Sequence, residues 1–415
     1  MFRKKIARML LRVLLPGVLC AQDTPLLPPD LLRLSRIRER MARNLDHLPN
    51  YTCRQTIQRS RRRAPSRRFE FQDTLRLEVA LVEGKELFAW PGAARFEDRD
   101  IAEMVGGGAI GNGSFALHAR SVFLSNVPAF TWRGEEILSG RVTLRYDFKV
   151  PQFRSGYTVK VGQAKAIVGY HGSFWVDETS LDLIRLEIFA DDIPPYLPLT
   201  SASDAMEYRI ARIGESDFNL PASSELVMVD TEGGESRNVT QFNNCRQYSG
   251  ESTLSFAEAP TETAESPAAP LELRVPAGVL LDTALDGPID SANAAAGDEI
   301  TATLRSAVKK NKQVLVQKGA VLHGRITRLA KRDATFLVSV DFQELTFEHS
   351  RATLKVTLSE VGPILGMRNP RLGRLPSAGA EYGIVENDPS GPTFFVRAGR
   401  LLLPRGTRLV FETAP

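Results

Sequence analysis

Apolar residues near the start of the chain recur at steps of three and four, which is the spacing of one face of a helix. The positions that share this spacing are Leu31, Leu34, Ile37, Met41, Leu45 and Leu48. Arginines and acids lie between them, so the segment predicts one amphipathic helix. Asp30 is the expected N-cap of this helix, and Pro49 is its expected stop.

Alternation with a period of two begins directly after that helix. "YTCRQTIQR" from Tyr51 is strand-like, and "FEFQDTLRLEVALV" alternates apolar residues at 75, 77, 79 and 81 with Thr74, Arg76, Glu78 and Ala80. Such a pattern predicts a sheet with one face in water. Strand-like segments separated by turn residues continue from Ile137 to Phe256. Residues 28–256 therefore predict an α+β domain, a long antiparallel meander with one or two helices.

The segment "SFWVDETSLDLIRLEIF" within this region is typical of a hairpin. Asp177, Glu178 and the two hydroxyl residues after them form the turn. In the strand that follows, Ile184, Leu186 and Ile188 are expected on one face, with the charged residues between them on the other.

Residues 257–270, "AEAPTETAESPAAP", have no apolar periodicity and the composition of a linker. After them, a turn followed by a strand recurs at Gly278, Gly319 and Gly406. Short strands fill most of the remainder, apart from a polar loop at 366–392. Residues 271–415 therefore predict a second domain, a small all-β barrel or sandwich.

The first residues are typical of a secretory signal peptide at positions 1–22. Basic residues from Arg3 to Arg8 precede a short apolar stretch at 13–19, and the small residues Cys20 and Ala21 suit cleavage. Two alternatives are a basic amphipathic helix that stays attached and lipid attachment at Cys20. No stretch supplies the roughly 20 apolar residues of a transmembrane helix, so no transmembrane span is expected.

Composition excludes some classes of function. The chain has 415 residues, of which 43% are hydrophobic and 25% charged, and its formal net charge is only +4. This is ordinary globular material, long enough for two hydrophobic cores. The mild charge gives no reason to expect a nucleic-acid partner.

Three cysteines allow a simple expectation in an exported protein. If Cys20 leaves with the signal peptide, Cys53 and Cys245 remain as a pair in an oxidising compartment. A disulfide bond between them would close a loop of about 190 residues and contribute at most about 5 kcal/mol. We expect it to join the first strand of the domain to the last and to hold the edges of the sheet. The alternative is two buried thiols.

A basic run, "RSRRRAPSRR", lies between the first two predicted strands. Its arginines are expected either in a solvated hairpin loop or in contact with an anionic lipid or glycan surface. The residues concerned are Arg59, Arg61, Arg62, Arg63, Arg67 and Arg68.

No catalytic or metal-binding set is assembled in the sequence. Gly106, Gly108 and Gly111 match the spacing of a dinucleotide-binding loop, but a helical pattern precedes them and the ribose-binding acid is missing, so a glycine-rich loop before the helical segment "SFALHARSVFLS" is expected. The acidic pairs Asp98 with Asp100 and Asp191 with Asp192 are typical of turns. The five histidines lack metal-ligand spacing, so no metal ion and no cofactor are expected; they are His47, His118, His171, His323 and His349.

Two partial resemblances follow from longer motifs. "GSFWVDETSLDLIRLEI" resembles the hairpin of the half-barrel fold of the outer-membrane lipoprotein carrier and of the related periplasmic regulators that bind an anti-sigma factor. This resemblance spans about Pro28 to Phe256. It implies a curved sheet whose concave apolar face is filled by helices or by a ligand such as an acyl chain.

The second resemblance covers Leu271 to Leu345. "VPAGVLLDTALDGPIDSANAAAGDEITATL" and "VLVQKGAVLHGRI" are similar to the C-terminal β-domain of the channel-forming component of conjugation and type IV secretion machines. The loop at 366–392 lacks an apolar helix pair. Pore formation is therefore not expected, and the resemblance implies a β-module of the cell envelope.

Together these features predict an exported, non-enzymatic envelope protein in the periplasm or outside the cell. Its half-barrel would bind a lipid, a lipoprotein or a segment of a protein partner, and its β-module would dock to another envelope protein. The alternative is a structural or stress-sensing periplasmic protein without a small-molecule ligand, in which the helix at 31–48 plugs the sheet. The ligand-binding residues cannot be assigned from the sequence.

Overall fold

The computed structural model describes residues 28–82, 84–93, 96, 101–104, 109–111, 113–162, 164–248, 271–272, 275–310, 313–364, 367, 381–388 and 390–415. Several expectations fall outside these residues and stay predictions. They are the signal peptide, the linker at 257–270, most of the polar loop, the glycines at 106 and 108, and the acids at 98 and 100.

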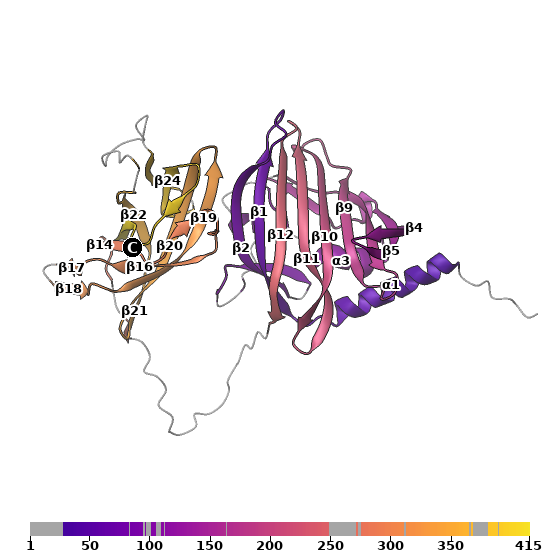
Figure 1. The fold of residues 1–415 in the computed structure, drawn as a ribbon, viewed down its shortest axis with the longest axis horizontal. Helices are drawn as coiled ribbons and strands as arrows, with labels where there is room; N and C mark the ends of the chain where they lie inside the picture. Colours follow the sequence, from indigo (N-terminus) through magenta and orange to yellow (C-terminus); the bar gives the residue numbers. More distant parts are fainter. Residues whose placement is uncertain are drawn as a thin grey trace, which may run out of the picture.

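The N-terminal half-barrel, residues 28–248, is built on one curved antiparallel sheet. Its strands follow the spatial order β3 (Lys85–Ala89), β2 (Glu70–Val82), β1 (Tyr51–Arg62), β12 (Glu235–Gln247), β11 (Ser216–Asp230), β10 (Leu199–Ile213), β9 (Leu183–Asp191), β8 (Gly169–Asp177), β5 (Arg141–Val150) and β4 (Ala129–Leu138). Figure 1 shows these strands side by side, with β2 nearest the C-terminal β domain and β4 on the far side. A small hairpin, β6 (Thr158–Val161) with β7 (Ala164–Ile167), stands outside this sheet.

Helices fill one end of the concave face. α1 (Pro29–Asp46) buries Ile37, Met41 and Leu45 against β5, β8 and α3 (Leu117–Phe123), in a core that contains Phe174. Each of these aliphatic side chains contributes about 1.5–3 kcal/mol by leaving water. The helix predicted at 31–48 is therefore confirmed, and it plugs part of the concavity.

Two details at the ends of elements differ from expectation. Pro28, not Asp30, is the N-cap of α1, because Pro29 at the first helical position has a φ that is already suited to a helix, so the helix begins before Asp30. In β9, Leu183 is fully buried while Ile184 is only half-buried. The register shifts between Trp175 and Val176, and this bulge moves the inward position by one residue.

The C-terminal β domain contains only strands among its described residues. They are β13 (Leu271–Glu272), β14 (Leu280–Leu285), β15 (Ile289–Asp290), β16 (Glu299–Leu304), β17 (Val308–Lys310), β18 (Gln313–Val316), β19 (Val321–Arg332), β20 (Thr335–Phe347), β21 (Ser350–Thr353), β22 (Val356–Val361), β23 (Tyr382–Val385), β24 (Thr393–Arg397), β25 (Leu402–Leu403) and β26 (Arg408–Thr413). The ladder runs β22-β26-β14-β16-β19-β20-β24-β23 and bends around one apolar core.

Sequence patterns located most of this domain. Gly278, Gly319 and Gly406 all have positive φ, and each is followed two residues later by a strand, as the repeated turn predicted. The polar loop expected over 366–392 is shorter than predicted. Tyr382, which is 2% exposed, begins strand β23 inside that range.

The two parts meet at the outer edge of β2. Strand β3 pairs with β2 only from Glu78 to Val82, which leaves the earlier half of this edge unpaired within the half-barrel. Residues of the C-terminal domain occupy it: Ala330 of β19 pairs with Asp73, and Ala296 forms a bridge to Leu75. An α+β half-barrel with an additional all-β domain is thus the fold, as the sequence predicted.

Candidate functional site

A cavity of about 1820 Å³ opens on the concave side of the half-barrel, beyond the part that α1 and α3 fill. Small-molecule pockets in proteins usually measure about 300–1,000 Å³, so this one has room for a large ligand. Its walls come from β1, β2, β10 and β11, from the short helix α2 (Ile101–Met104), from the β6–β7 hairpin and from the end of β19.

Apolar side chains form much of the inner wall. Leu75 and Ile101 are buried, whereas Leu226 and Met228 on β11 are only half-buried because they border the open space. Leu199 on β10 closes the wall toward the β6–β7 hairpin. Together they form a surface that an aliphatic chain can cover, with the hydrophobic effect as the driving force.

A polar cluster interrupts this wall. The Ser114 hydroxyl donates to Asp204 Oδ2 at 2.7 Å, and His118 Nε2 lies 3.6 Å from the same oxygen. Asp204 is 3% exposed, and its Oδ1 has no hydrogen-bond partner among the described residues. Burial, together with the Asp204 charge, raises the pKa of the nearby Tyr157.

The geometry of this cluster is not that of a nucleophilic triad. In such a triad the histidine bonds to the serine hydroxyl and the acid bonds to the histidine. Here Ser114 and His118 both approach the carboxylate of Asp204 instead. The acidic pair at 191 and 192 does not join the cluster, because Asp191 binds His171 at 2.8 Å and Asp192 lies in a turn with positive φ.

The arginines of the basic run differ in burial. Arg59 is 2% exposed and makes a bidentate ion pair with Asp73, at 2.7 and 2.6 Å. It is therefore part of the cavity wall, and its expected contact with an external anionic surface is corrected. The reason is that β1 extends to Arg62, so the basic run begins inside the strand and its alternation turns Arg59 inward.

The other arginines of the run are exposed or half-buried, and three of them line the cavity. Arg61 and Arg63 line it and form long ion pairs with Asp230 (3.7 Å) and Asp333 (4.0 Å). Arg62 pairs with Glu235. Arg67 and Arg68 are exposed in the turn, and Arg68 lines the cavity. Their contact with a lipid or glycan surface stays a prediction.

The disulfide bond between Cys53 and Cys245 is present, with a sequence separation of 192. It joins β1 to β12, the first and last strands of the half-barrel along the chain, at a bulge between Thr52 and Arg54. The expectation that it holds the edges of the sheet is wrong. β1 and β12 are neighbours inside the sheet, whose outer strands are β3 and β4.

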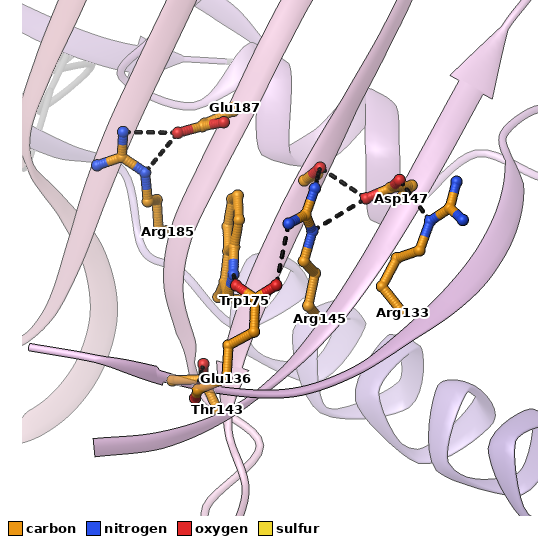
Figure 2. A network of polar contacts seen from close by, with 9 residues as sticks. Arg133, Glu136, Thr143, Arg145, Asp147, Trp175, Arg185 and Glu187 are labelled. Carbon is orange, nitrogen blue, oxygen red and sulfur yellow. Dashed lines mark hydrogen bonds and ion pairs between the residues drawn. The ribbon is translucent and has the colours of Figure 1, made fainter. Parts of the chain in front are cut away.

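Figure 2 shows a polar network on the face of β4, β5 and β8 that points away from the apolar core. Glu136 accepts hydrogen bonds from the Trp175 indole at 2.8 Å and from Arg145 at 3.0 Å, and these two contacts lower its pKa. Asp147 binds Arg133 at 2.6 Å and Arg145 at 3.2 Å. None of these residues lines the cavity, so the network stabilises the outer face of the sheet.

None of the helices among the described residues combines the length and the apolar content that crossing a bilayer requires. In the same residues, no three His, Cys, Asp or Glu side chains are grouped so that they could hold a metal ion.

Comparison with known proteins gives distant structural matches only. No protein-family model matches the chain, and no curated protein does. A putative outer membrane lipoprotein-sorting protein domain from Vibrio parahaemolyticus matches at 11% identity and a TM-score of 0.29, over 53% of this chain and 92% of that one. A LolA superfamily protein from Nitrosomonas europaea matches at 10% identity and a TM-score of 0.28, over 52% and 93%.

A DUF1329 family protein from Desulfovibrio piger matches at 15% identity and a TM-score of 0.27, over 52% of this chain and 92% of its own. The first two names belong to the lipoprotein-carrier group that the N-terminal part resembles in sequence. Likeness at this level carries no functional conclusion. The resemblance of the C-terminal part to a secretion-channel domain has no counterpart in these three and stays a prediction.

Sequence reasoning missed most of the cavity. Asp204 and His118 are 86 positions apart by number, and neither stands in a motif; only the fold brings them within 3.6 Å. Arg328 and Lys331 come from the other domain. The one available signal was the basic run at Arg59–Arg68, which marks the rim.

Proposed function

We propose that this protein is an exported, non-enzymatic cell-envelope protein that binds an acyl chain in the cavity of its half-barrel. The observation that carries the proposal is the cavity of about 1820 Å³ with apolar residues of β2, β10 and β11 in its wall. A pocket of this size is too large for a typical metabolite and suits the chain of a lipid or a lipoprotein.

Two further features support export and the lack of an enzymatic role. The disulfide bond between Cys53 and Cys245 is of a kind that persists in oxidising compartments. Asp204 in the wall of the cavity is contacted by both Ser114 and His118, and this arrangement does not activate the serine as a nucleophile. The C-terminal β domain, in this proposal, docks to another envelope component.

A second candidate function has one observation in its favour. α1 buries Ile37, Met41 and Leu45 in the concave face, so part of the space that a carrier would offer to its ligand is already filled. A structural or sensing protein without a small-molecule ligand would need only this filled part. The open part of the concavity favours the ligand-binding proposal.

Native mass spectrometry of the full chain distinguishes the two functions. The protein, purified from an oxidising compartment, is measured before and after organic extraction, and again after incubation with phosphatidylglycerol vesicles. We expect a lipid-sized adduct that extraction removes. A bare polypeptide mass in all three samples would reject acyl-chain binding and favour the structural role.

A matched pair of substitutions locates the bound chain. Met228 borders the cavity and is half-buried, so Met228→Trp should fill the space and reduce lipid loading about tenfold, which is the effect of losing about 1.4 kcal/mol. Ile137→Trp places the same side chain at a residue that is 78% exposed and outside the cavity, and should leave loading unchanged. Equal loss in both variants would place the lipid elsewhere.

A further inference from the structure

The charges around the cavity are unbalanced. Basic residues from three separate elements line it, on the β1–β2 side, on the β6–β7 hairpin and at the end of β19. They outnumber the acidic lining residues, which are Glu70, Asp73, Glu103, Asp204, Asp230 and Asp333. The lining of the cavity therefore carries net positive charge.

Ion pairs within the protein neutralise only part of this charge. Arg59 binds Asp73, and Arg328 of β19 binds Asp388 at 3.1 Å with both side chains largely buried. These pairs are structural, because each partner satisfies the other out of water. Arg332 at the end of β19 and Lys165 on β7 are different: both are exposed at the cavity.

The β6–β7 hairpin holds two like charges directly opposite each other. Lys160 and Lys165 are paired across the ladder, and both line the cavity. The hairpin therefore places two basic residues side by side in the lining of the cavity.

The basic residues of the C-terminal domain reach the cavity because this domain contacts β2. Arg76 N–H donates to the Ala296 carbonyl at 2.7 Å, and the Arg76 side chain pairs with Asp298 and donates to the Asn293 carbonyl at 2.7 Å. This contact holds the β19–β20 turn over the mouth of the cavity, where Lys331 and Arg332 line it.

We infer that the ligand is an amphiphile with an anionic, phosphate-bearing head, and that the two domains hold this head jointly. The inference rests on the proposed acyl-chain binding and adds the chemistry of the head. The chain lies on the wall of Leu226 and Met228, and the head lies between Lys165 of the half-barrel and Arg332 of the C-terminal domain.

A competition between two lipids tests the head separately from the chain. The full-length protein is incubated with vesicles of equimolar phosphatidylglycerol and phosphatidylcholine with identical acyl chains, and the bound lipids are measured by native mass spectrometry. Total loading reports on chain binding, and the ratio of the two lipids reports on the head. We expect phosphatidylglycerol to be enriched about tenfold over the vesicle composition, because its phosphate makes a charge-assisted contact in the cavity that is worth about 1.4 kcal/mol over phosphatidylcholine.

Neutralising one cation from each domain should remove this preference. In the double variant Lys165→Gln with Arg332→Gln, we expect the enrichment to fall close to unity while total loading persists. The matched control is Lys149→Gln with Arg405→Gln, which removes one exposed cation from each domain outside the cavity and should keep the enrichment.

The remaining outcomes have distinct meanings. Equal binding of the two lipids by the unaltered protein would overturn the inference and leave acyl-chain binding in place. Loss of the enrichment in the control pair as well would also overturn it, because the preference would then follow net charge. A further sample of the protein is offered inorganic phosphate alone. If this sample retains phosphate while the vesicle samples load no lipid, both the inference and the proposed function are overturned, because the cations then bind a free anion.

Discussion

The Arg59–Asp73 pair buries two charges in the wall of the cavity, which costs free energy of folding. Both side chains are at most 5% exposed, and the guanidinium binds the carboxylate through two nitrogens. Removing two charges from water costs several kcal/mol per ion, and the pair recovers this cost only while both partners are present. The pair and Leu75 both line the cavity, so a charged segment lies beside an apolar one in this wall.

Breaking this pair should destabilise the half-barrel strongly. Asp73→Leu removes the carboxylate that binds the buried guanidinium of Arg59, and we expect a loss of about 3–5 kcal/mol in the free energy of unfolding. The double variant Arg59→Met with Asp73→Leu should recover most of this loss. Urea denaturation followed by tryptophan fluorescence reports the unfolding of the half-barrel, because Trp90, Trp132 and Trp175 all lie in this domain.

An exposed ion pair provides the control for this prediction. Arg43 and Glu39 pair on the surface of α1 with more than half of each side chain exposed. Glu39→Ala should therefore change the free energy of unfolding by only about 0.5 kcal/mol. If Asp73→Leu proved equally mild, the buried pair would not exist in solution.

At the scale of elements, the disulfide bond joins two strands that hydrogen bonds already hold together. β1 and β12 pair from Tyr51 with Gln247 to Arg62 with Glu235. Cys53 is 1% exposed and packs in a core with Phe242 and Tyr51. The bond is therefore not needed to define the register of these strands, and its main effect is on the unfolded chain.

Removal of the bond should lower stability without changing the fold. For the double variant Cys53→Ala with Cys245→Ala, the loop-closure estimate gives a loss of at most about 5 kcal/mol. The far-ultraviolet circular dichroism spectrum should stay unchanged, while the midpoint of urea denaturation falls. Wild-type protein unfolded and measured in reductant is the matched comparison. An unaltered midpoint in both would show that the unfolded state is already compact.

For the whole molecule, the sequence predicted the individual elements and domains well, but it did not predict the contacts between distant segments. Helical spacing from Leu31 to Leu48 and the turn glycines at 278, 319 and 406 located their elements because each pattern is local. The cavity depends on contacts between distant segments, such as Asp204 with His118, which leave no periodic signal. The bulge that puts Leu183 rather than Ile184 on the inward face could not be predicted from the sequence either, because it depends on the pairing with β8.

The contact between the two domains also joins segments that are distant in the sequence, and it covers an unpaired strand edge of the half-barrel. An unpaired strand edge can pair with another chain, and the first half of β2 would present such an edge. Ala296 covers it by accepting from Arg76 N–H at 2.7 Å and donating to the Thr74 carbonyl at 3.0 Å. The same contact carries Lys331 and Arg332 to the cavity, so protection of the edge and completion of the binding site depend on one loop.

Gly297 lies in this loop, and one added methyl group there should disrupt the contact between the loop and β2. Its φ is +105°, which L side chains rarely adopt, and an added Cβ would lie 2.0 Å from the Arg76 carbonyl oxygen. Gly297→Ala must therefore displace the loop from β2. We expect the amides of Arg76 and Ala296 to exchange with deuterium at least about tenfold faster, as local opening becomes easier.

The same variant separates the role of the loop from that of the cavity wall. Because Leu226 and Met228 are untouched, Gly297→Ala should still load lipid from vesicles of phosphatidylglycerol and phosphatidylcholine, but with the preference for phosphatidylglycerol reduced toward unity. Gly287→Ala is the control, since an added Cβ there meets no atom within 4 Å. If Gly297→Ala exposed the two amides and yet kept the full preference, the cations of the half-barrel alone would hold the head. The C-terminal domain would then serve to cover the edge of β2 rather than to complete the site.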